Sequence, residues 1–467
     1  MIKRRMEEVK RLHFKLKPPA IIALSFLLVI FVGSGLLMLP GMTNEGMGIT
    51  YLEAIFTSTS ATCVTGLVNI GEGVAATFSI YGRIVIAILI QLGGLGVTTL
   101  AVAVFLIVTD SLSLSQQSLI KEGWNLSSFK SLRVIFFRVL VLSFIFEFLG
   151  AVLSFTDFYF IHQFPLDEAI GLGVFHSVSA FNNAGFDLFG TTSIIAFQND
   201  VYLNFITGFL IVCGGLGYFA ILDIFAKQLN FKKFMLHTKI VVTFTISLII
   251  LGGVGLYLLE IGNESNLNFL GSFFLSVSTR TAGFTTYDLS KFSDASLILM
   301  ILLMFIGASP GGTGGGIKTT TFALLFYYVI GIITKRHPSA FNRSISKNQI
   351  RRAEVIILLG LGFFIIGFFA ITIFERDFGY ILNGEKIKYY VEGALRFSPM
   401  DYSFEVMSAF GTVGLSTGIT SYFSSGSQIV LIILMYVGRI GPLTISSVYS
   451  SNNIKHYRYA TEEVSIG

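Results

Sequence analysis

The chain has 467 residues, of which 53% are hydrophobic and only 13% are charged, and its formal net charge is +5. This number of charged residues is too small to cover the surface of a soluble globular protein of this length. The composition therefore excludes soluble globular proteins and indicates an integral membrane protein. The basic residues lie in short segments between apolar runs, which is typical of membrane topology rather than of nucleic-acid binding.

Seven apolar runs are long enough to cross a lipid bilayer, because a transmembrane helix needs about 20 mainly apolar residues. The first run follows a lysine- and arginine-rich segment, but it exceeds signal-peptide length and lacks a small-residue cleavage site. We therefore interpret it as a retained span. In chain order, the runs cover residues 18–39, 84–108, 134–155, 202–225, 237–259, 355–374 and 428–448.

Basic connections alternate with acidic ones along the chain. Residues 41–54, 156–170 and 260–269 contain no lysine or arginine, whereas residues 1–17, 121–138, 227–239, 335–352 and the C-terminal tail are basic. Short basic loops remain on the cytoplasmic side of a membrane. The sequence therefore predicts a multi-pass protein of the cell membrane with both termini in the cytoplasm.

A polar turn with glycine at its fifth position occurs four times, each after a hydroxyl-rich segment of helical character that is too short to span. The turns are TCVTGL at residues 62–67, FNNAGF at 181–186, TRTAGF at 279–284 and FGTVGL at 410–415. A second glycine-bearing segment follows each turn at a similar interval, as QLGGLG, CGGLGY, SPGGTGGG and VGRIGP. Such repetition determines the architecture before any single residue is considered.

The repeating unit is a span, a re-entrant half-helix, a turn and a second span. We expect an all-α membrane protein with eight transmembrane helices and four re-entrant half-helices around one central pore. The expected segments are a basic N-terminus at 1–17, units at 18–109, 134–226, 237–334 and 353–449, and a cytoplasmic tail at 450–467.

Non-helical backbone at membrane depth is tolerated only where it is buried in protein or lines a water-filled cavity. Glycine lets such a backbone point carbonyl oxygens at a dehydrated cation, and the half-helices direct their negative C-terminal ends at the same place. The alternative is that these glycines only permit close helix packing. The expected cation-binding residues are Thr62, Cys63, Val64, Thr65, Gly66, Asn182, Asn183, Ala184, Gly185, Arg280, Thr281, Ala282, Gly283, Gly411, Thr412, Val413 and Gly414.

The second span of the third unit is interrupted by seven glycines and Pro310, which favours a loop over a continuous helix. A proline kink is the alternative. The string also resembles a phosphate-binding loop, but Ile317 separates Gly316 from Lys318 and no strand precedes it, which argues against nucleotide binding.

Several polar residues within the apolar segments need an explanation. Arg439, in the last span, would face the pathway or pair with a buried acid. Arg280 would repel a cation, so we expect its side chain behind the turn, toward Asp401 or Glu405.

Asn182 and Asn183 would brace the second turn, although turn propensity explains them nearly as well. Glu147 and Asp223 make a poor proton relay, and His176 is typical of packing within a half-helix. The two cysteines, Cys63 and Cys213, suggest neither a disulfide nor a metal site.

The segments AFNNAGF at 180–186, STRTAGF at 278–284 and SPGGTGGGIKT at 309–319 resemble the Trk/Ktr/HKT superfamily of potassium transporters, in particular its bacterial KtrB-type uptake subunits. The resemblance covers nearly the whole chain. It implies a selectivity filter at Gly66, Gly185, Gly283 and Gly414, with Cys63 a small departure, and a homodimer on a cytoplasmic KtrA-type nucleotide-binding ring. It also implies an intramembrane gate, formed here by Gly311, Gly312, Thr313, Gly314, Gly315, Gly316, Lys318 and Arg439.

The sequence therefore predicts potassium uptake, stimulated by sodium and controlled by the separate ring, with potassium and possible sodium as the only bound ions. No turn has the double glycine of TVGYG, so we expect a shorter and less symmetric filter. A proton- or sodium-coupled secondary transporter is the alternative, although its repeats would be inverted rather than parallel. An enzyme is not expected, because no nucleophile with a base, metal-ligand cluster or cofactor motif is found.

Overall fold

The computed structural model describes residues 18–96, 132–376, 380–382, 385–387 and 395–442, and they are mostly helical. The basic segment 1–17, the far end of the span expected at 84–108, most of the connection at 121–138 and the tail at 450–467 lie outside these residues. The long helices are α2 (Pro18–Leu37), α8 (Leu132–Thr156), α12 (Leu236–Leu259) and α16 (Lys347–Phe374).

Three helices among the described residues are long and apolar enough to cross a membrane, namely Phe137–Ile161, Leu236–Leu259 and Lys347–Phe374. Large apolar side chains on these helices point outward: Phe148 is 69% exposed and Ile366 is 66% exposed. Water would not tolerate so continuous an apolar surface, whereas lipid tails would cover it. These faces mark the chain as membrane-embedded.

A shorter helix ends at each of the four glycine turns. Three of them begin with a side-chain cap: Thr50 and Glu53 form a reciprocal capping box at the first, Asn268 caps the third, and Ser398 and Asp401 form a second capping box at the fourth. These helices are α3 (Tyr51–Thr62), α9 (Leu166–Phe181), α13 (Phe269–Ser278) and α17 (Pro399–Gly411).

The helix that follows each turn is also short. Gly96, Gly217 and Gly441, with φ between +80° and +93°, end three of these helices, because few other residues adopt that conformation. At Gly217 the chain bends by 96° into α11 (Tyr218–Ala226). The run expected as a span at 202–225 is therefore two helices joined at Gly217, and within the run expected at 428–448 the helix ends before Gly441. The four helices are α5 (Ile80–Leu95), α10 (Val201–Leu216), α14 (Asp294–Phe305) and α18 (Ser425–Ile440).

The four repeats pack in a closed circle. Each turn-bearing helix contacts the helix before it in its own unit, and α3, α9 and α17 also contact the helix after them. Each following helix also contacts the turn-bearing helix of the next unit: α5 contacts α9, α10 contacts α13, α14 contacts α17, and α18 returns to α3. The largest buried cluster joins the ends of the chain, with Phe56 and Leu67 against Phe410 and Leu431.

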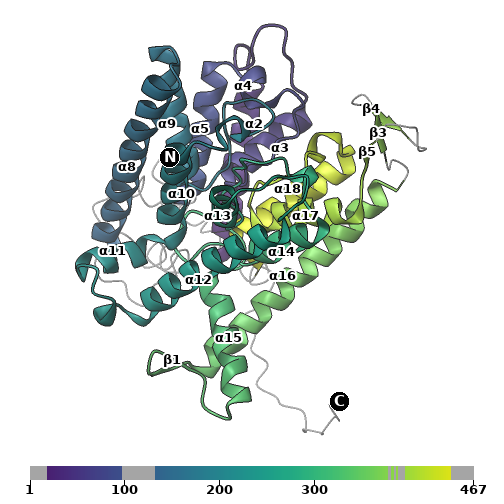
Figure 1. The fold of residues 1–467 in the computed structure, drawn as a ribbon. Coiled ribbons are helices and arrows are strands. Elements are labelled where there is room, and N and C mark those ends of the chain that lie inside the picture. Colours follow the sequence, from purple (N-terminus) through teal and green to yellow (C-terminus); the bar gives the residue numbers. More distant parts are fainter. Residues whose placement is uncertain (1–17, 97–131, 377–379, 383–384, 388–394, 443–467) are drawn as a thin grey trace, which may run out of the picture.

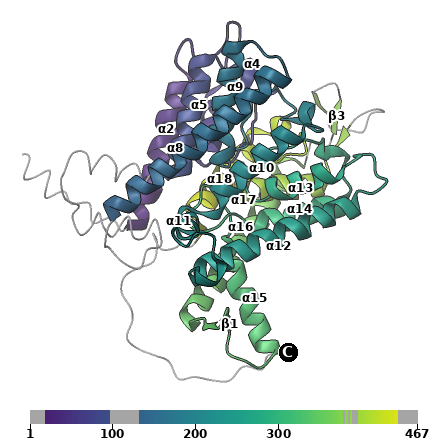
Figure 2. The ribbon, with the colours of Figure 1, turned by 60° about the vertical axis from the view of Figure 1, so that its left-hand side comes forward.

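Short strands occur outside the helical bundle, which the expectation of an all-α chain missed. β1 (Ser339–Ala340) pairs with β2 (Arg343–Ser344) beyond α15 (Thr319–Ile333). β3 (Tyr380–Leu382) pairs with both β4 (Glu385–Ile387) and β5 (Leu395–Arg396). In Figures 1 and 2, α15 and β1 lie at one end of the molecule, and α4 (Gly73–Thr77) and β3 lie at the other.

The remaining elements are single turns in the connections. They are η1 (Asp157–Ile161), η2 (Ile195–Phe197), η3 (Phe231–Lys233), η4 (Leu289–Lys291) and η5 (Thr420–Tyr422). The basic connection around η3 lies near the same end as β1, since Phe231 packs edge-on against Phe341, with ring centroids 5.9 Å apart. Two basic connections that are distant in sequence therefore share one end of the molecule.

Candidate cation site

The four glycine turns meet in a ring. A Cβ added to Gly66 would collide with the carbonyl oxygen of Ala184, and a Cβ on Gly185 would lie 2.6 Å from the carbonyl oxygen of Ala282. The same substitution at Gly283 would strike the carbonyl of Val413, and at Gly414 it would strike that of Thr65. Each fifth-position glycine therefore lies against the fourth-position carbonyl of the next turn, and the fourth turn closes onto the first.

The backbone of each turn alternates in conformation. The third residue has φ between +51° and +75°, and the glycine at the fifth position has φ between +71° and +97°. Three of the third-position residues, Val64, Thr281 and Thr412, are β-branched, and such residues rarely adopt positive φ. Strain of about 1–3 kcal/mol at each is sustained only where the surroundings impose it, and it is concentrated at functional sites.

The fourth-position N–H groups point back into the half-helices. They donate from Thr65 to the carbonyl of Ser60 at 2.8 Å, and equivalently from Ala184 to Ser179, Ala282 to Ser278 and Val413 to Ser408. With these donors turned away, the carbonyl oxygens at the third, fourth and fifth positions accept no hydrogen bond from any described residue. Buried carbonyls are almost always paired. Carbonyl oxygens left free in this way, the four fourth-position ones of the closed ring among them, are available to coordinate a cation.

The second-position side chains point away from the ring. The guanidinium of Arg280 is buried and donates to Thr245 Oγ1 on α12 at 3.3 Å. Its side chain therefore lies behind the turn, but the expected partners Asp401 and Glu405 are wrong. The amide of Asn182 donates to Gln91 and to Glu147, both at 3.0 Å, so it braces the second turn. Cys63 and Gly411, at the same position in the other turns, are also buried.

The side chains that hold two of the turns were not singled out from the sequence. Ser60 Oγ accepts the N–H of Gly66 and Ser408 Oγ accepts that of Gly414, each at 3.0 Å. Glu405 accepts from Ser416, Thr420 and the backbone of the chain leaving the fourth turn. The hydroxyl-rich segments before the turns were the available signal, since serine stands six residues before the glycine in the first, second and fourth turns.

The interruption in the third unit is a loop, at residues 306–318 between α14 and α15, so the proline-kink alternative is wrong. Its two ends meet, because the N–H of Gly307 donates to the carbonyl of Ile317 at 2.8 Å. Added Cβ atoms at Gly314 and Gly315 would collide with Thr281 and Thr412 of the third and fourth turns. The loop therefore lies directly against the ring.

Hydrogen bonds attach the loop to other units. The N–H of Thr313 donates to the carbonyl of Gly214 at 3.1 Å, and its hydroxyl donates to the carbonyl of Phe181 at 3.1 Å. Arg439 donates to the carbonyls of Thr313 and Gly93, so among the described residues it bonds to backbone carbonyls rather than to an acid. Lys318 folds back onto the carbonyl of Gly314 at 2.7 Å. Arg439 thus connects the loop to the first and fourth units, while Lys318 stabilises the loop's own conformation. Of the other loop residues, Gly312 faces the backbone of α10, while Gly311 and Gly316 have positive φ.

The buried ionisable residues near the turns have structural partners. Glu147 accepts from Ser143 and from Asn182, and Asp223 accepts the backbone N–H of Met235 at 2.9 Å. His176 is 2% exposed and shares a 2.8 Å hydrogen bond with Thr207. These contacts describe a scaffold around the ring rather than a chain of proton carriers.

Comparison with known proteins identifies the family of the chain. The model of the TrkH family, described as a cation transport protein, matches residues 17–457. The potassium/sodium uptake protein NtpJ of Enterococcus hirae is 33% identical, and the match covers 98% of this chain and 99% of the relative. The Ktr system potassium uptake protein B of Bacillus subtilis is 32% identical over 96% of this chain and 97% of the relative.

The fold has a solved counterpart. The crystal structure of the potassium transporter TrkH from Vibrio parahaemolyticus superposes with a TM-score of 0.68 at 18% identity, covering 94% of this chain and 86% of that one. At this identity the likeness shows the fold alone, while the family model and the full-length relatives show the family. The chain belongs to the TrkH family of membrane-embedded cation transport proteins.

Proposed function

We propose that this protein takes up potassium across the cell membrane through a selectivity filter formed by the four glycine turns. The observation that carries the proposal is the ring of buried carbonyl oxygens without hydrogen-bond partners. Such oxygens replace the hydration shell of an ion that enters without its water. The C-terminal ends of α3, α9, α13 and α17 meet at the same ring and add negative potential, which favours cations.

Potassium is the proposed substrate because the carbonyls are uncharged and numerous, which suits a large, weakly hydrated monovalent ion better than a divalent one. Both relatives described above are named as potassium uptake proteins, and the name of one also includes sodium. We therefore propose that sodium stimulates uptake or enters to a lesser extent. None of the four turns has the double glycine of TVGYG, so the proposed filter is shorter than one built on that sequence.

The loop at residues 306–318 would act as the gate. It lies against the third and fourth turns and is tied to the second and fourth units, so any movement of those units would shift it. The guanidinium of Arg439, which donates to the carbonyl of Thr313 in the loop, would raise the barrier for a cation that passes it. Opening would require the hydrogen bonds of Thr313 to break or rotate together.

Growth of cells that lack potassium uptake tests the proposal. Expression of this protein should restore growth at low external potassium and produce saturable uptake of radioactive rubidium, because the ring would coordinate both ions. Uptake should rise when sodium is added. Protein that reaches the membrane without restoring growth or rubidium uptake would contradict the proposal, and uptake abolished by a protonophore at constant membrane potential would favour the proton-coupled alternative.

We further propose that the protein forms a homodimer and binds a cytoplasmic KtrA-type nucleotide-binding ring. Two relatives are named as components of a Ktr system, which supports a partner. The basic connections around η3 and β1 share one end of the molecule and would face the cytoplasm with both termini. That end is the proposed docking face.

Mild-detergent purification from native membranes should recover a soluble nucleotide-binding protein with this chain. Reversing the charge of the connection at β1, with Arg336→Glu and Arg343→Glu, should reduce its recovery at least tenfold, because both residues are exposed there. Lys291→Glu, at the opposite end, is the matched control. Recovery of this chain alone would argue against the partner.

A further inference from the structure

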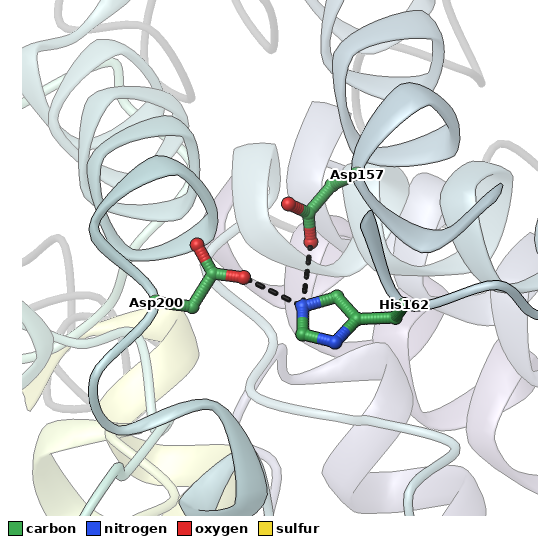
Figure 3. Close-up of side chains that lie close together, drawn as sticks. All are labelled: Asp157, His162 and Asp200. Carbon is green, nitrogen blue, oxygen red and sulfur yellow. Dashed lines mark hydrogen bonds and ion pairs between the residues drawn. The ribbon is translucent and has the colours of Figure 1, made fainter. Parts of the chain in front are cut away.

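Three side chains that the transport proposal does not use converge where α8 ends and α10 begins. His162 Nε2 lies 2.7 Å from Asp200 Oδ2 and 3.6 Å from Asp157 Oδ2. Figure 3 shows both carboxylates directed at this one nitrogen. The donor atoms of the three residues all lie within 4.8 Å of one another.

Local structure positions each of the three. The turn η1 brings His162 back over Asp157, because the N–H of His162 donates to the carbonyl of Asp157 at 3.1 Å. Asp200 is the N-cap of α10, and its Oδ1 accepts the N–H of Leu203 at 3.0 Å. This leaves Oδ2 to face the histidine. The imidazole packs edge-on against Phe197, with ring centroids 4.7 Å apart, which limits its rotation.

Asp157 is the unsatisfied member of the group. Its side chain is 0% exposed, and neither carboxylate oxygen has a hydrogen-bond partner among the described residues. The nearby imidazole already has Asp200 at hydrogen-bond distance. A buried carboxylate needs a compensating charge or donor. With a neutral histidine, the group carries two negative charges and lacks such a counter-charge.

We propose that Asp157, His162 and Asp200 bind a divalent transition-metal cation, with Zn²⁺ the best match. Zinc bonds to imidazole nitrogen and carboxylate oxygen are about 2.0–2.2 Å long, which places neighbouring donors in a tetrahedron about 3.3–3.5 Å apart. The 3.6 Å separation already fits. The 2.7 Å contact would open by about 0.7 Å as the ion replaces the hydrogen bond.

The donor set also selects among ions. Mg²⁺ and Ca²⁺ prefer all-oxygen sites, whereas imidazole suits Zn²⁺ and its transition-metal neighbours. Three protein ligands leave the fourth tetrahedral position for water. All three residues come from the second unit, and none of them is part of the carbonyl ring. The competing explanation is a protonated His162 held as an ion pair, without metal.

Titration of the full-length protein in detergent tests the site. After treatment with a chelator, Zn²⁺ should displace a fluorescent indicator at one ion per chain, and Co²⁺ should give a visible spectrum typical of four-coordination. Asp200→Asn keeps an oxygen for the helix cap but removes a charged ligand, and His162→Gln removes the nitrogen. Each should weaken binding by more than about 100-fold, since loss of an outer-shell contact alone costs about 10- to 100-fold.

Two exposed residues provide matched controls. Asp288→Asn and His337→Gln make the same chemical changes at exposed positions, and Zn²⁺ binding should remain as in the parent. Modification of His162 by diethyl pyrocarbonate, mapped by mass spectrometry, gives a readout on the unmutated protein. Zn²⁺ should protect His162 but not His337. Absence of a one-to-one cobalt spectrum in the parent, or equal modification of His162 with and without Zn²⁺, would establish the ion pair instead.

Discussion

Replacing Gly283 or Gly414 with serine should lower the apparent affinity of potassium uptake by about tenfold or more. Both residues have positive φ, +82° and +97°, and an added Cβ would strike the carbonyl of Val413 or Thr65 in the neighbouring turn. The serine side chain would strain the backbone by about 1–3 kcal/mol, and we expect the coordinating carbonyl to move so that this strain is relieved. Each loss of about 1.4 kcal/mol in the binding free energy of the ion lowers its affinity tenfold. Rubidium uptake at varied external potassium measures the effect.

Gly262 offers a matched control for that experiment. Its φ of +80° is nearly the same, but nothing lies within 4 Å of an added Cβ. Gly262→Ser should therefore introduce similar backbone strain and leave the affinity unchanged. If both filter variants take up potassium with the affinity of the parent, the four turns do not bind the ion during uptake.

Deleting residues 312–315 should raise the unidirectional ion flux by about tenfold, which corresponds to about 1.4 kcal/mol off the barrier. The deletion removes Thr313 and its hydrogen bonds to Gly214, Phe181 and Arg439. It leaves the turns intact. Because Gly307 and Ile317 are already joined by a hydrogen bond, the shortened segment can close without separating α14 from α15.

The charge at the loop can be tested separately. Arg439→Gln should also increase flux, since it removes a fixed positive charge near the path of the cation. Lys291→Gln removes an exposed lysine elsewhere and should have no effect. The measurement is rubidium entry into proteoliposomes that hold equal amounts of folded protein. A folded deletion variant that conducts no faster than the parent would rule out gating by this loop.

The turns were predictable from the sequence because their pattern repeats, and the structure brings Gly66, Gly185, Gly283 and Gly414 together. The helix breaks at Gly217 and Gly441 were missed, since apolar residues continue on both sides and hydrophobicity does not report φ. The partner of Arg280 was misassigned because a threonine gives no charge signal.

Other features depend on contacts between distant segments. Asp157 and Asp200 are separated by a half-helix and a turn, and no metal-ligand spacing links them with His162. The short pairings of β3 with β4 and β5 involve two or three residues each, which is too few for an alternating pattern to appear. Sequence patterns reveal periodic features well, but they reveal single contacts between distant residues poorly.

One continuous chain supplies all four turns of the ring, which are here called its walls, so the sequences of the four walls can differ. A substitution in a channel made of four identical subunits alters every wall at once, whereas here it alters one quarter of the circumference. The residues behind the walls have already diverged, with Cys63, Asn182, Arg280 and Gly411 at equivalent places. If the ring selects ions as proposed, its preference can therefore be adjusted in four separate, graded steps, by natural variation or by engineering, one turn at a time.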